Sequence, residues 1–438
     1  MTEEQELIEF VTSQRWFGSK TRDAIHAHVI DRAVLRDEEP RLELQLVEIG
    51  FDTGTHETYQ LLTDGGFDAI GDPRNVRELV HMLRGRRNVP AGEGVVEFGV
   101  VEGQAGAGGE LRDARQIESE QSNTSEIFDE QLILKIFRRL EAGINPELEM
   151  LRFLTEHGFP NIAALAGWYA YAGRPMDATL GILQTFVPDG EDGWELTLDS
   201  LGGREEELYA RLRRLGAVTA QMHNTLGSDG DDPNFCPETA SPESLGLLTA
   251  SVDEEIEALF LDLPDNIEEL EPIRGRGEEV RERLRMLTNI GGLGKVIRHH
   301  GDFHLGQTLW AGNDWVILDF EGEPARSLPE RRRKRSPLRD VAGMLRSLAY
   351  AASAAPMLRD KDAPGDFEQR GREAFLAGYH EVVDTALVPY GSSFEKLLAV
   401  FELEKSVYEL RYELNNRPEW LSIPVAGIVR MLAAEVPA

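Results

Sequence analysis

The chain contains a single cysteine, Cys236, among its 438 residues. One cysteine excludes an internal disulfide framework, and such a thiol is more often incidental than nucleophilic. The chain also lacks any run of about eighteen apolar residues, the length that a membrane-spanning helix needs. Its opening residues, Thr2 to Glu6, are polar and acidic, unlike a secretory signal peptide. We therefore expect a cytoplasmic protein with no membrane partner.

Lysine is scarce, with seven residues, and arginine supplies most of the positive charge. The 78 acidic residues outnumber the 46 basic ones, and the formal net charge is −32. A surface of this sign repels phosphate backbones, so we expect no nucleic-acid partner. Adaptation to high salt and a GC-rich genome are both open explanations for this composition. The basic run Arg331–Arg335 is the exception, and it is either a solvated loop or an element that holds phosphate.

With 438 residues, of which 41% are apolar, the chain is long enough for two or three packed units. In the first ninety residues, a helix is expected over Gln5–Thr12 and strands over Leu42–Ile49 and Thr58–Leu62. The glycine-rich passage Gly92–Gly109 offers little material for a core. It predicts a flexible connection or a hairpin turn.

The most informative stretch is His300–Gln307, which reads His-Gly-Asp-Phe-His-Leu-Gly-Gln and precedes a predicted hairpin. The hairpin strands are Thr308–Trp310 and Trp315–Leu318, and the residues between them favour a tight turn. The second strand is apolar without alternation and ends at Asp319. A carboxylate at the end of a buried strand needs a cationic partner, and a metal ion is the best candidate.

Two side chains in this region suit Mg²⁺, which prefers hard oxygen ligands. They are the carboxylate of Asp319 and the amide oxygen of Gln307, with nucleotide phosphates and water as further ligands. Asp302 remains free to orient and deprotonate an acceptor hydroxyl, and His304 converges on the same loop. Any single acid here could be a turn or cap residue. The combined spacing predicts a phosphotransferase that uses ATP and Mg²⁺.

A second region suits the phosphates of ATP. Leu132–Phe137 is an apolar, strand-like run that Lys135 interrupts, and a half-buried ammonium needs an anionic partner. Nucleotide phosphates provide that partner in kinases. The polar residues just upstream could cover the phosphates with hydroxyl, amide and backbone N–H groups, or they could form an ordinary hairpin turn. These residues are Gln121, Ser122, Asn123, Thr124 and Ser125.

A helix is expected after Lys135, where Asn145-Pro146 supplies a cap and a first-turn proline, and it extends to His157. Glu147 and Glu149 both lie near its start, where the helix dipole favours acids in any case. One of the two is expected to pair with Lys135, and the chemistry leaves the choice open.

Leu180–Val187 reads as a buried strand that leads into Pro188. In a kinase this segment is the hinge that binds adenine, and the candidates are Gln184, Phe186 and Val187. A domain boundary is expected here, followed by a mostly helical region. The expected helices are Glu205–Asn224, Glu254–Leu261, Gly277–Leu287, Ser336–Ala355 and Glu368–Val383, with Asp340 in the fourth bracing the catalytic loop.

The last predicted helix, Phe401–Asn416, has two distinct faces. One is apolar and suits the core. The other combines aromatic planes with polar tips, which suits a sugar, although chemistry alone also allows a solvated surface. This second face carries Lys405, Tyr408, Glu409, Tyr412 and Asn416. Glu321, close to Asp319, is a further candidate to meet the sugar, the metal or an arginine.

These motifs resemble a known family. His300–Gln307 is similar to the His-Gly-Asp-x-His-x-x-Asn/Gln loop of the aminoglycoside phosphotransferase-like kinases. Asp319–Pro324 and Ser336–Arg346 resemble the maltokinase branch, and the glutamine that ends the catalytic loop fits that branch. The resemblance continues at Gln14–Lys20 and Tyr408–Pro418, so it covers essentially the whole chain.

The resemblance implies an α+β, bilobal, protein-kinase-like fold. An N-terminal cap is expected in residues 1–90, a β-rich nucleotide-binding part in 91–187 and a mostly helical lobe in 188–438. It further implies phosphorylation of maltose to maltose 1-phosphate with ATP and Mg²⁺, and a functional association with a trehalose-isomerising enzyme. It points to Glu149 as the partner of Lys135, and it favours a phosphate-covering role for Ser122–Ser125.

Two alternatives remain. A kinase of another acceptor, such as glucosamine or an aminoglycoside, would use the same loop, and an amino sugar would favour extra acidic residues around the acceptor. An inactive nucleotide or sugar sensor is the second, and the intact Asp302, Lys135 and Asp319 argue against it.

Overall fold

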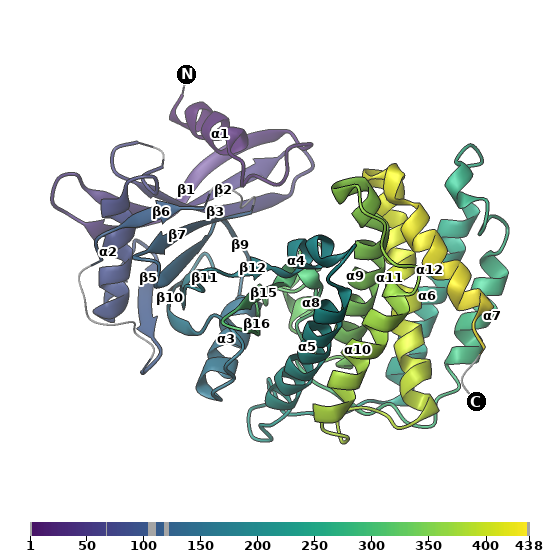
Figure 1. The fold of residues 1–438 in the computed structure, drawn as a ribbon. Helices are drawn as coiled ribbons and strands as arrows, with labels where there is room; N and C mark the ends of the chain where they lie inside the picture. The colour runs from purple at the N-terminus through teal and green to yellow at the C-terminus, as the bar shows by residue number, and fades with distance from the viewer. Residues whose placement is uncertain (1, 67, 104–110, 118–121, 436–438) are drawn as a thin grey trace. The chain divides into compact units, whose positions relative to one another are not determined.

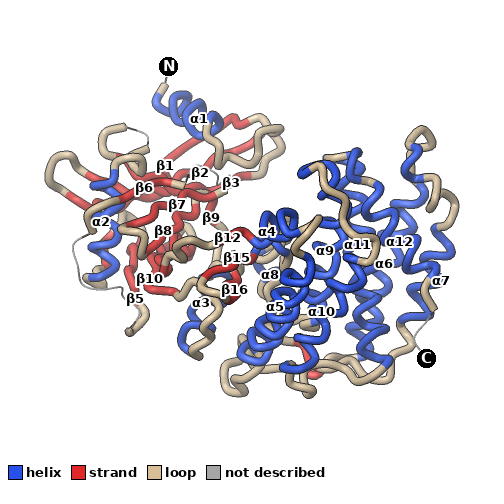
Figure 2. The backbone as a smooth tube through the Cα atoms, viewed as in Figure 1, coloured by secondary structure: helices blue, strands red, loops and turns tan. Residues whose placement is uncertain are grey.

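The computed structural model describes the whole chain except residues 1, 67, 104–110, 118–121 and 436–438. The chain folds into two compact units, residues 1–189 and 190–438. Figure 1 shows that the first unit holds the long strands and the second holds most of the helices, and Figure 2 separates the two kinds of element by colour. This mixed architecture, with an N-terminal cap and a helical C-terminal region, confirms the predicted α+β, kinase-like fold class. Within the described ranges, no helix has both the length and the apolar composition to cross a membrane.

The first unit contains two antiparallel sheets. One has the strand order β1-β2-β3-β9 and the other the order β4-β5-β10-β11-β8-β7-β6. The strands are β1 (Ala24–Arg36), β2 (Leu42–Phe51), β3 (His56–Thr63), β4 (Asn88–Pro90), β5 (Gly94–Val100), β6 (Ala114–Gln116), β7 (Asn123–Phe128), β8 (Leu132–Phe137), β9 (Arg139–Leu140), β10 (Leu165–Gly173) and β11 (Asp177–Thr185). The helices are α1 (Glu3–Ser13), α2 (Pro73–Arg84) and α3 (Pro146–Glu156).

The helix expected near the N-terminus is α1, and its ends follow from the local sequence. The Thr2 hydroxyl accepts the Gln5 N–H, and the Gln5 side chain accepts the Thr2 N–H, which forms a capping box. Leu7 and Val11 lie one turn apart and are buried against the sheet of β1–β3 together with Trp16 and other aromatic residues. This core attaches the helix to the four-stranded sheet, which we call the cap sheet.

The glycine-rich passage begins as the turn of a hairpin, because residues 91–93 join β4 to the antiparallel β5, which agrees with one of the two predicted alternatives. The strand that follows was not predicted. Gly94–Val100 forms β5, which pairs with both β4 and β10. Val96 and Phe98 are buried and alternate with more exposed residues, so a period of two outweighs the low propensity of glycine for strands. Residues 104–110 of the same passage lie outside the described residues.

The second unit is mostly helical. Its helices are α4 (Gly193–Ser200), α5 (Glu205–Leu226), α6 (Pro242–Leu261), α7 (Gly277–Leu287), α8 (Leu328–Arg331), α9 (Leu338–Arg359), α10 (Phe367–Val382), α11 (Ser392–Asn416) and α12 (Ser422–Ala433). Short 3₁₀ helices cover Glu268–Leu270, Leu305–Gln307 and Pro418–Trp420. The strands are β12 (Glu191–Asp192), β13 (Glu238–Thr239), β14 (Lys295–Val296), β15 (Thr308–Ala311) and β16 (Asp314–Ile317). The pairing of β15 with β16 confirms the predicted hairpin.

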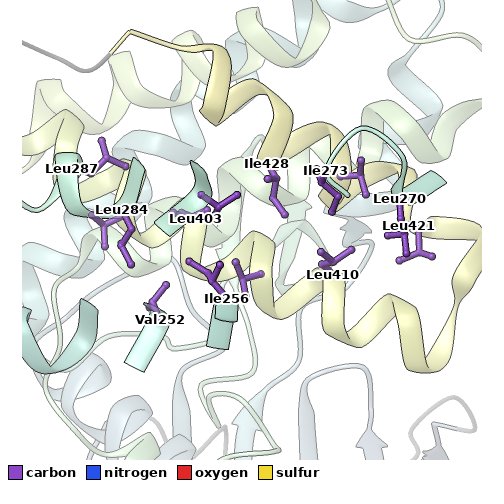
Figure 3. Packing of buried hydrophobic residues seen from close by; sticks show 14 residues of the cluster. Val252, Ile256, Leu270, Ile273, Leu284, Leu287, Leu403, Leu410, Leu421 and Ile428 are labelled. Atoms are coloured by element: carbon purple, nitrogen blue, oxygen red, sulfur yellow. The ribbon is translucent and has the colours of Figure 1, made fainter. Parts of the chain in front are cut away.

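One apolar core fixes the rotation of α11 (Figure 3). Leu403 and Leu410 of α11 are buried in this core beside residues such as Ile256 of α6, Leu284 of α7 and Ile428 of α12. The apolar face predicted for this helix is therefore confirmed. Because that face points into the core, the polar and aromatic face of α11 is left to line a site.

Candidate active site

The loop that contains Asp302, which we call the catalytic loop, is held by Asp340 at the start of α9. The buried Asp340 carboxylate accepts the backbone N–H groups of His300 and Gly301 at 2.8 and 2.9 Å. His223 Nε2 lies 3.1 Å from the same carboxylate. Burial alone would raise the pKa of Asp340, but the imidazoles around it, including that of His223, hold the pKa well below its ordinary value. Asp340 therefore stays ionised and braces the loop, as predicted.

The catalytic loop and the loop after β16 approach each other closely. His300 Nε2 donates to the Leu318 carbonyl oxygen at 2.8 Å. Gly301 and Gly322 have φ angles of 89° and 74°, and a Cβ on Gly301 would lie 3.3 Å from the Gly322 Cα. Asp319 also has a positive φ, 58°, a conformation that aspartate adopts more readily than most residues. These backbone conformations bring the two loops that carry the predicted catalytic and metal-binding carboxylates together.

Gln307 and Asp319, the predicted magnesium ligands, lie side by side. Gln307 Nε2 donates to Asp319 Oδ2 at 3.1 Å. Glu321 offers a carboxylate oxygen within 4.8 Å of an Asp319 oxygen. This combination of amide and carboxylate groups fits a hard divalent cation such as Mg²⁺. Glu321 lies beside Asp319 and lines neither of the two cavities described next to Asp302, so contact between Glu321 and a sugar stays a prediction.

Lys405 of α11 lies beside Asp302. Its Nζ is 3.7 Å from Asp302 Oδ1 and 3.4 Å from Glu323 Oε1. Burial would lower the pKa of Lys405, but Asp302 and Glu323 raise it above its ordinary value, so the ammonium stays charged. His304 Nε2 is 4.0 Å from Asp302 Oδ2, and burial lowers the pKa of His304, so its imidazole is neutral at pH 7. Asp302 thus has one cationic and one neutral neighbour.

A cavity of about 660 Å³ opens beside Asp302 within the second unit. Tyr408 and Tyr412 of α11 line it, with stacked rings whose centroids are 6.5 Å apart. Tyr350 of α9 and Trp420 also line it, and their rings stack with centroids 6.2 Å apart. The cavity therefore offers two pairs of aromatic rings within the same space as the catalytic carboxylate.

Two glutamates of this cavity are already paired with arginines. Arg346 donates to Glu409 Oε2 from both Nε and Nη2, at 2.9 and 2.7 Å. Arg417 donates to the two oxygens of Glu413 at 2.9 and 2.8 Å, and the Tyr350 hydroxyl donates to Glu413 at 3.0 Å. The negative charges of both glutamates are therefore paired with positive charges. These contacts also join α9, α11 and the segment after α11 to one another.

Asn416 is not part of this cavity, which corrects the prediction. Its side chain is exposed and donates to the Tyr412 carbonyl oxygen at 2.8 Å, at the last residue of α11. Conversely, sequence reasoning missed Tyr350, Arg346 and Trp194, which belong to α9 and α4. The spacing of Arg346 and Tyr350, four residues apart on one predicted helix, was an available signal, because such residues share a face.

Within the first unit, Lys135 of β8 pairs with Glu147. Lys135 Nζ lies 2.7 Å from Glu147 Oε2, and the side chains are 12% and 2% exposed. Gln184 Nε2 lies 3.5 Å from the other Glu147 oxygen. The choice of Glu149 as the partner was wrong. Side chains two residues apart on a helix point in directions that differ by roughly 200°, so Glu147 and Glu149 lie on opposite faces of α3. Asn145 is the N-cap of α3, and with this start of the helix Glu147 is the buried one of the two.

The polar stretch expected to cover phosphates is largely strand, because Asn123–Ser125 open β7. Ser125 is directly opposite Lys135 in the β7–β8 pairing, so both side chains lie on one face of the sheet. Thr124 lies on the other face, where its hydroxyl accepts a hydrogen bond from the buried Arg138 Nε at 2.8 Å. Thr124 therefore has a structural role, while Ser125 shares a face with the lysine. Ser122 precedes the strand, and Gln121 lies outside the described residues.

The predicted hinge follows directly after β11, which ends at Thr185. Gln184 pairs with Ile133 in the sheet. The Phe186 N–H donates to the Gln131 carbonyl oxygen at 2.7 Å, so the group that Phe186 can offer a base is its own carbonyl. Adenine binding by Gln184, Phe186 and Val187 stays a prediction.

Comparison with known proteins identifies the family. The profile of the phosphotransferase enzyme family matches residues 113–376, which is more than half of the chain. The profile of the maltokinase N-terminal cap domain matches residues 10–65. The chain therefore belongs to the phosphotransferase enzyme family and carries a cap of the maltokinase type.

Curated relatives and solved structures agree with this assignment. The glucosamine kinase of Mycolicibacterium smegmatis is 26% identical over 331 residues, which are 73% of this chain and 80% of the relative. That of Streptacidiphilus jiangxiensis is 24% identical over 332 residues, 73% of each chain. A crystal structure of a glucosamine kinase has a TM-score of 0.76 at 20% identity and covers 97% of this chain and 99% of its own. Another, in complex with glucosamine, ADP and inorganic phosphate, has a TM-score of 0.74 at 20% identity, covering 97% and 98%.

Proposed function

We propose that this member of the phosphotransferase family transfers the γ-phosphoryl group of ATP to a sugar, with maltose as the acceptor and maltose 1-phosphate as the product. The observation that carries this proposal is the cavity beside Asp302, with two pairs of stacked aromatic rings and hydrogen-bonded polar groups. A sugar presents apolar C–H faces and a rim of hydroxyls, and such a wall complements both. A trehalose-isomerising enzyme would supply this substrate, and association with one stays a prediction.

Asp302 has the position and chemistry of the group that orients the acceptor. Its carboxylate lines the cavity and can accept a hydrogen bond from the anomeric hydroxyl. As the oxygen attacks the γ-phosphorus, the hydroxyl proton passes to Asp302, the new P–O bond forms and the bond to the β-phosphate oxygen of ADP breaks. Lys405, which stays charged, keeps a positive charge next to the carboxylate throughout.

In the first unit, Lys135 would bind the nucleotide phosphates, with Glu147 holding the ammonium in place. In the second unit, Gln307 and Asp319 would hold Mg²⁺ through an amide oxygen and a carboxylate. When bound, Mg²⁺ neutralises charge on the phosphate oxygens. The amide of Gln307 has to turn its oxygen rather than its nitrogen toward the ion. A flip of the amide about its terminal torsion achieves this without a change in the backbone.

The charges around the acceptor cavity support a neutral sugar. Glu409 and Glu413 each have an arginine partner, so neither carboxylate is left to pair with an ammonium group. Lys405 adds a positive charge next to Asp302, and it would repel an amino group placed near the reacting hydroxyl. The cap profile, which is named for maltokinase, supports the same acceptor.

Glucosamine is the second candidate, and the names of the relatives favour it. Glucosamine carries its amino group on the carbon next to the anomeric one, and Glu323, whose Oε1 is 3.4 Å from Lys405 Nζ, lines a second cavity next to Asp302. An amino group accommodated near Glu323 would have to share that carboxylate with Lys405 and Arg326.

A panel of acceptors tests the proposal. ADP release by the purified chain with ATP and Mg²⁺ is measured for maltose, methyl maltoside, glucose and glucosamine. We expect turnover with maltose and none with methyl maltoside, in which the anomeric hydroxyl is blocked, and we expect phosphorus NMR to place the phosphate on the anomeric carbon. Turnover with glucosamine in preference to maltose, or a phosphate elsewhere on the sugar, would overturn the assignment of the acceptor. The Asp302→Asn variant serves as the blank for background hydrolysis.

A further inference from the structure

Three of the ten histidines of the chain gather on one exposed face of the cap sheet. His26 and His28 belong to β1 and His56 to β3, on either side of β2. In the pairing of β1 with β2, His26 is opposite Gly50 and His28 is opposite Glu48, and in the pairing of β2 with β3, Gly50 is opposite His56. Directly opposite and alternate residues share a face, so the three imidazoles and Glu48 project from the same side of the sheet.

Glu48 lies between two of these imidazoles. Its Oε1 is 3.7 Å from His28 Nε2, and its Oε2 is 3.8 Å from His56 Nε2. The third imidazole, that of His26, has its Nδ1 3.2 Å from Glu4 Oε1 of α1. One carboxylate thus bridges imidazoles from two different strands, and a second carboxylate lies at the edge of the group.

Gly50 leaves open space in the middle of the group. It is opposite both His26 and His56, and a Cβ built on it would meet only the His26 Cβ, at 3.4 Å. Cβ atoms of directly opposite residues lie about 4.5–5.5 Å apart, so His26 on β1 and His56 on β3 each stand one strand away from Gly50. Because Gly50 has no side chain, the two imidazoles can extend toward each other above β2. The three histidine side chains are 60–72% exposed, so they can rotate without any shift of the backbone.

Ordinary surface chemistry gives little reason for this grouping. Exposed ion pairs contribute little to stability, and three positively charged imidazoles on one small face would repel one another. Neutral imidazoles and a carboxylate, by contrast, are the ligands that Zn²⁺ and similar borderline divalent ions prefer. Three adjacent strands of an antiparallel sheet hold the backbone positions of these residues side by side before any ion binds.

We propose that His26, His28, Glu48 and His56 form a binding site for one divalent transition-metal ion, of which Zn²⁺ is the probe, on the outer face of the cap sheet. The ion would join β1, β2 and β3 and so stabilise the cap. The site is distinct from the residues proposed for Mg²⁺, because those belong to the second unit and offer mainly oxygen ligands. Its existence is independent of which sugar the enzyme phosphorylates.

Equilibrium dialysis of the full chain against ZnCl₂ tests the proposal, with Asp319→Asn as the background so that the catalytic metal ligands do not contribute. We expect one Zn²⁺ ion per chain. The double variant His28→Ala/His56→Ala is expected to weaken Zn²⁺ binding by on the order of 10- to 100-fold or more, because substitution of groups that only support the ligands already costs that much affinity. His81→Ala is the matched control, because His81 is an exposed histidine of α2 in the same unit. It is expected to bind as the background protein does.

Co²⁺ gives a second readout. Nitrogen ligands in a tetrahedral site produce visible d–d absorption, which should appear with the Asp319→Asn chain and disappear in the His28→Ala/His56→Ala variant. Equal Zn²⁺ affinity in the double variant and in His81→Ala would overturn the proposal, as would the absence of a Co²⁺ spectrum. Circular dichroism checks that the exposed substitutions leave the fold intact.

Discussion

Arg346 donates two hydrogen bonds to a single carboxylate oxygen of Glu409, at 2.9 and 2.7 Å, and the two side chains are only 5% and 9% exposed. The pair joins α9 to α11 at the wall of the acceptor cavity. A buried ion pair adds little stability over apolar residues of the same volume, but the loss of one partner leaves an uncompensated charge in the interior.

The first prediction follows from this pair. Arg346→Leu is expected to lower the free energy of unfolding by about 3–5 kcal/mol, because Glu409 keeps a buried charge without a partner. The double variant Arg346→Leu/Glu409→Leu is expected to recover most of that loss. Urea denaturation of the wild type and both variants measures the difference. Equal destabilisation in the single and double variants would mean that lost packing, rather than charge, is responsible.

An exposed pair provides the control for this experiment. Arg115 and Glu130 form a similar two-bond pair at 2.7 and 3.1 Å, but the side chains are 56% and 54% exposed. Solvent screens such a pair, so Arg115→Leu is expected to lower the free energy of unfolding far less than Arg346→Leu does.

The second prediction concerns Asp302. Asp302→Asn keeps the shape of the side chain but removes the proton acceptor, so kcat is expected to fall by about 10²–10⁴-fold. Stability should change little, because the side chain is 26% exposed. ADP release with maltose measures the rate. His304→Gln is the comparison, and since His304 lies 4.0 Å from Asp302, its effect should be much smaller. An unchanged rate in Asp302→Asn would show that another group accepts the proton.

The third prediction separates the two glutamates of α3. Glu147→Gln removes the charge that lies 2.7 Å from Lys135 and is expected to weaken ATP binding by about tenfold, or about 1.4 kcal/mol. Glu149→Gln has the same chemistry two residues away, and it is expected to bind ATP as the wild type does. Calorimetric titration with a non-hydrolysable ATP analogue measures both. A larger loss in Glu149→Gln than in Glu147→Gln would reverse the assignment.

Sequence reasoning was most successful where chemistry is local. The hairpin of β15 and β16 has its turn and its apolar residues within one short segment, and Asp319 follows directly. The proximity of Asp302, His304 and Gln307 needs only one loop. The brace by Asp340 was predicted from its position near the start of a helix, and its two backbone hydrogen bonds confirm it.

Contacts between distant segments were harder to predict. The cavity wall depends on which face of α9 meets α11. The spacing of Arg346 and Tyr350 indicates that they share a face of α9, but it does not identify α11 as the helix that this face contacts. Asn416 was assigned from the helical period and from the resemblance of Tyr408–Pro418 to the maltokinase branch, but it lies at the exposed end of its helix, where the period no longer implies a shared surface. In contrast, α2 could have been found: Asp72 caps it, Pro73 begins it, and its apolar residues recur every three to four positions.

The last prediction concerns pH. His299 is 8% exposed, and burial lowers its pKa to about 3. In the unfolded chain a histidine has a pKa of about 6.5, so between about pH 3 and 6.5 the unfolded state binds one more proton than the folded state. Stability therefore falls as the pH falls through this window, approaching about 1.4 kcal/mol per pH unit.

His299→Phe removes this proton and should flatten the dependence of stability on pH. Between pH 7 and pH 5, the wild type is expected to lose about 2 kcal/mol more than the variant, whatever the stability of either at pH 7. Urea denaturation at four pH values across this range gives the two slopes. His81→Phe, a substitution at an exposed histidine, should retain the slope of the wild type. If His299→Phe also retained it, His299 would be protonated in the folded chain.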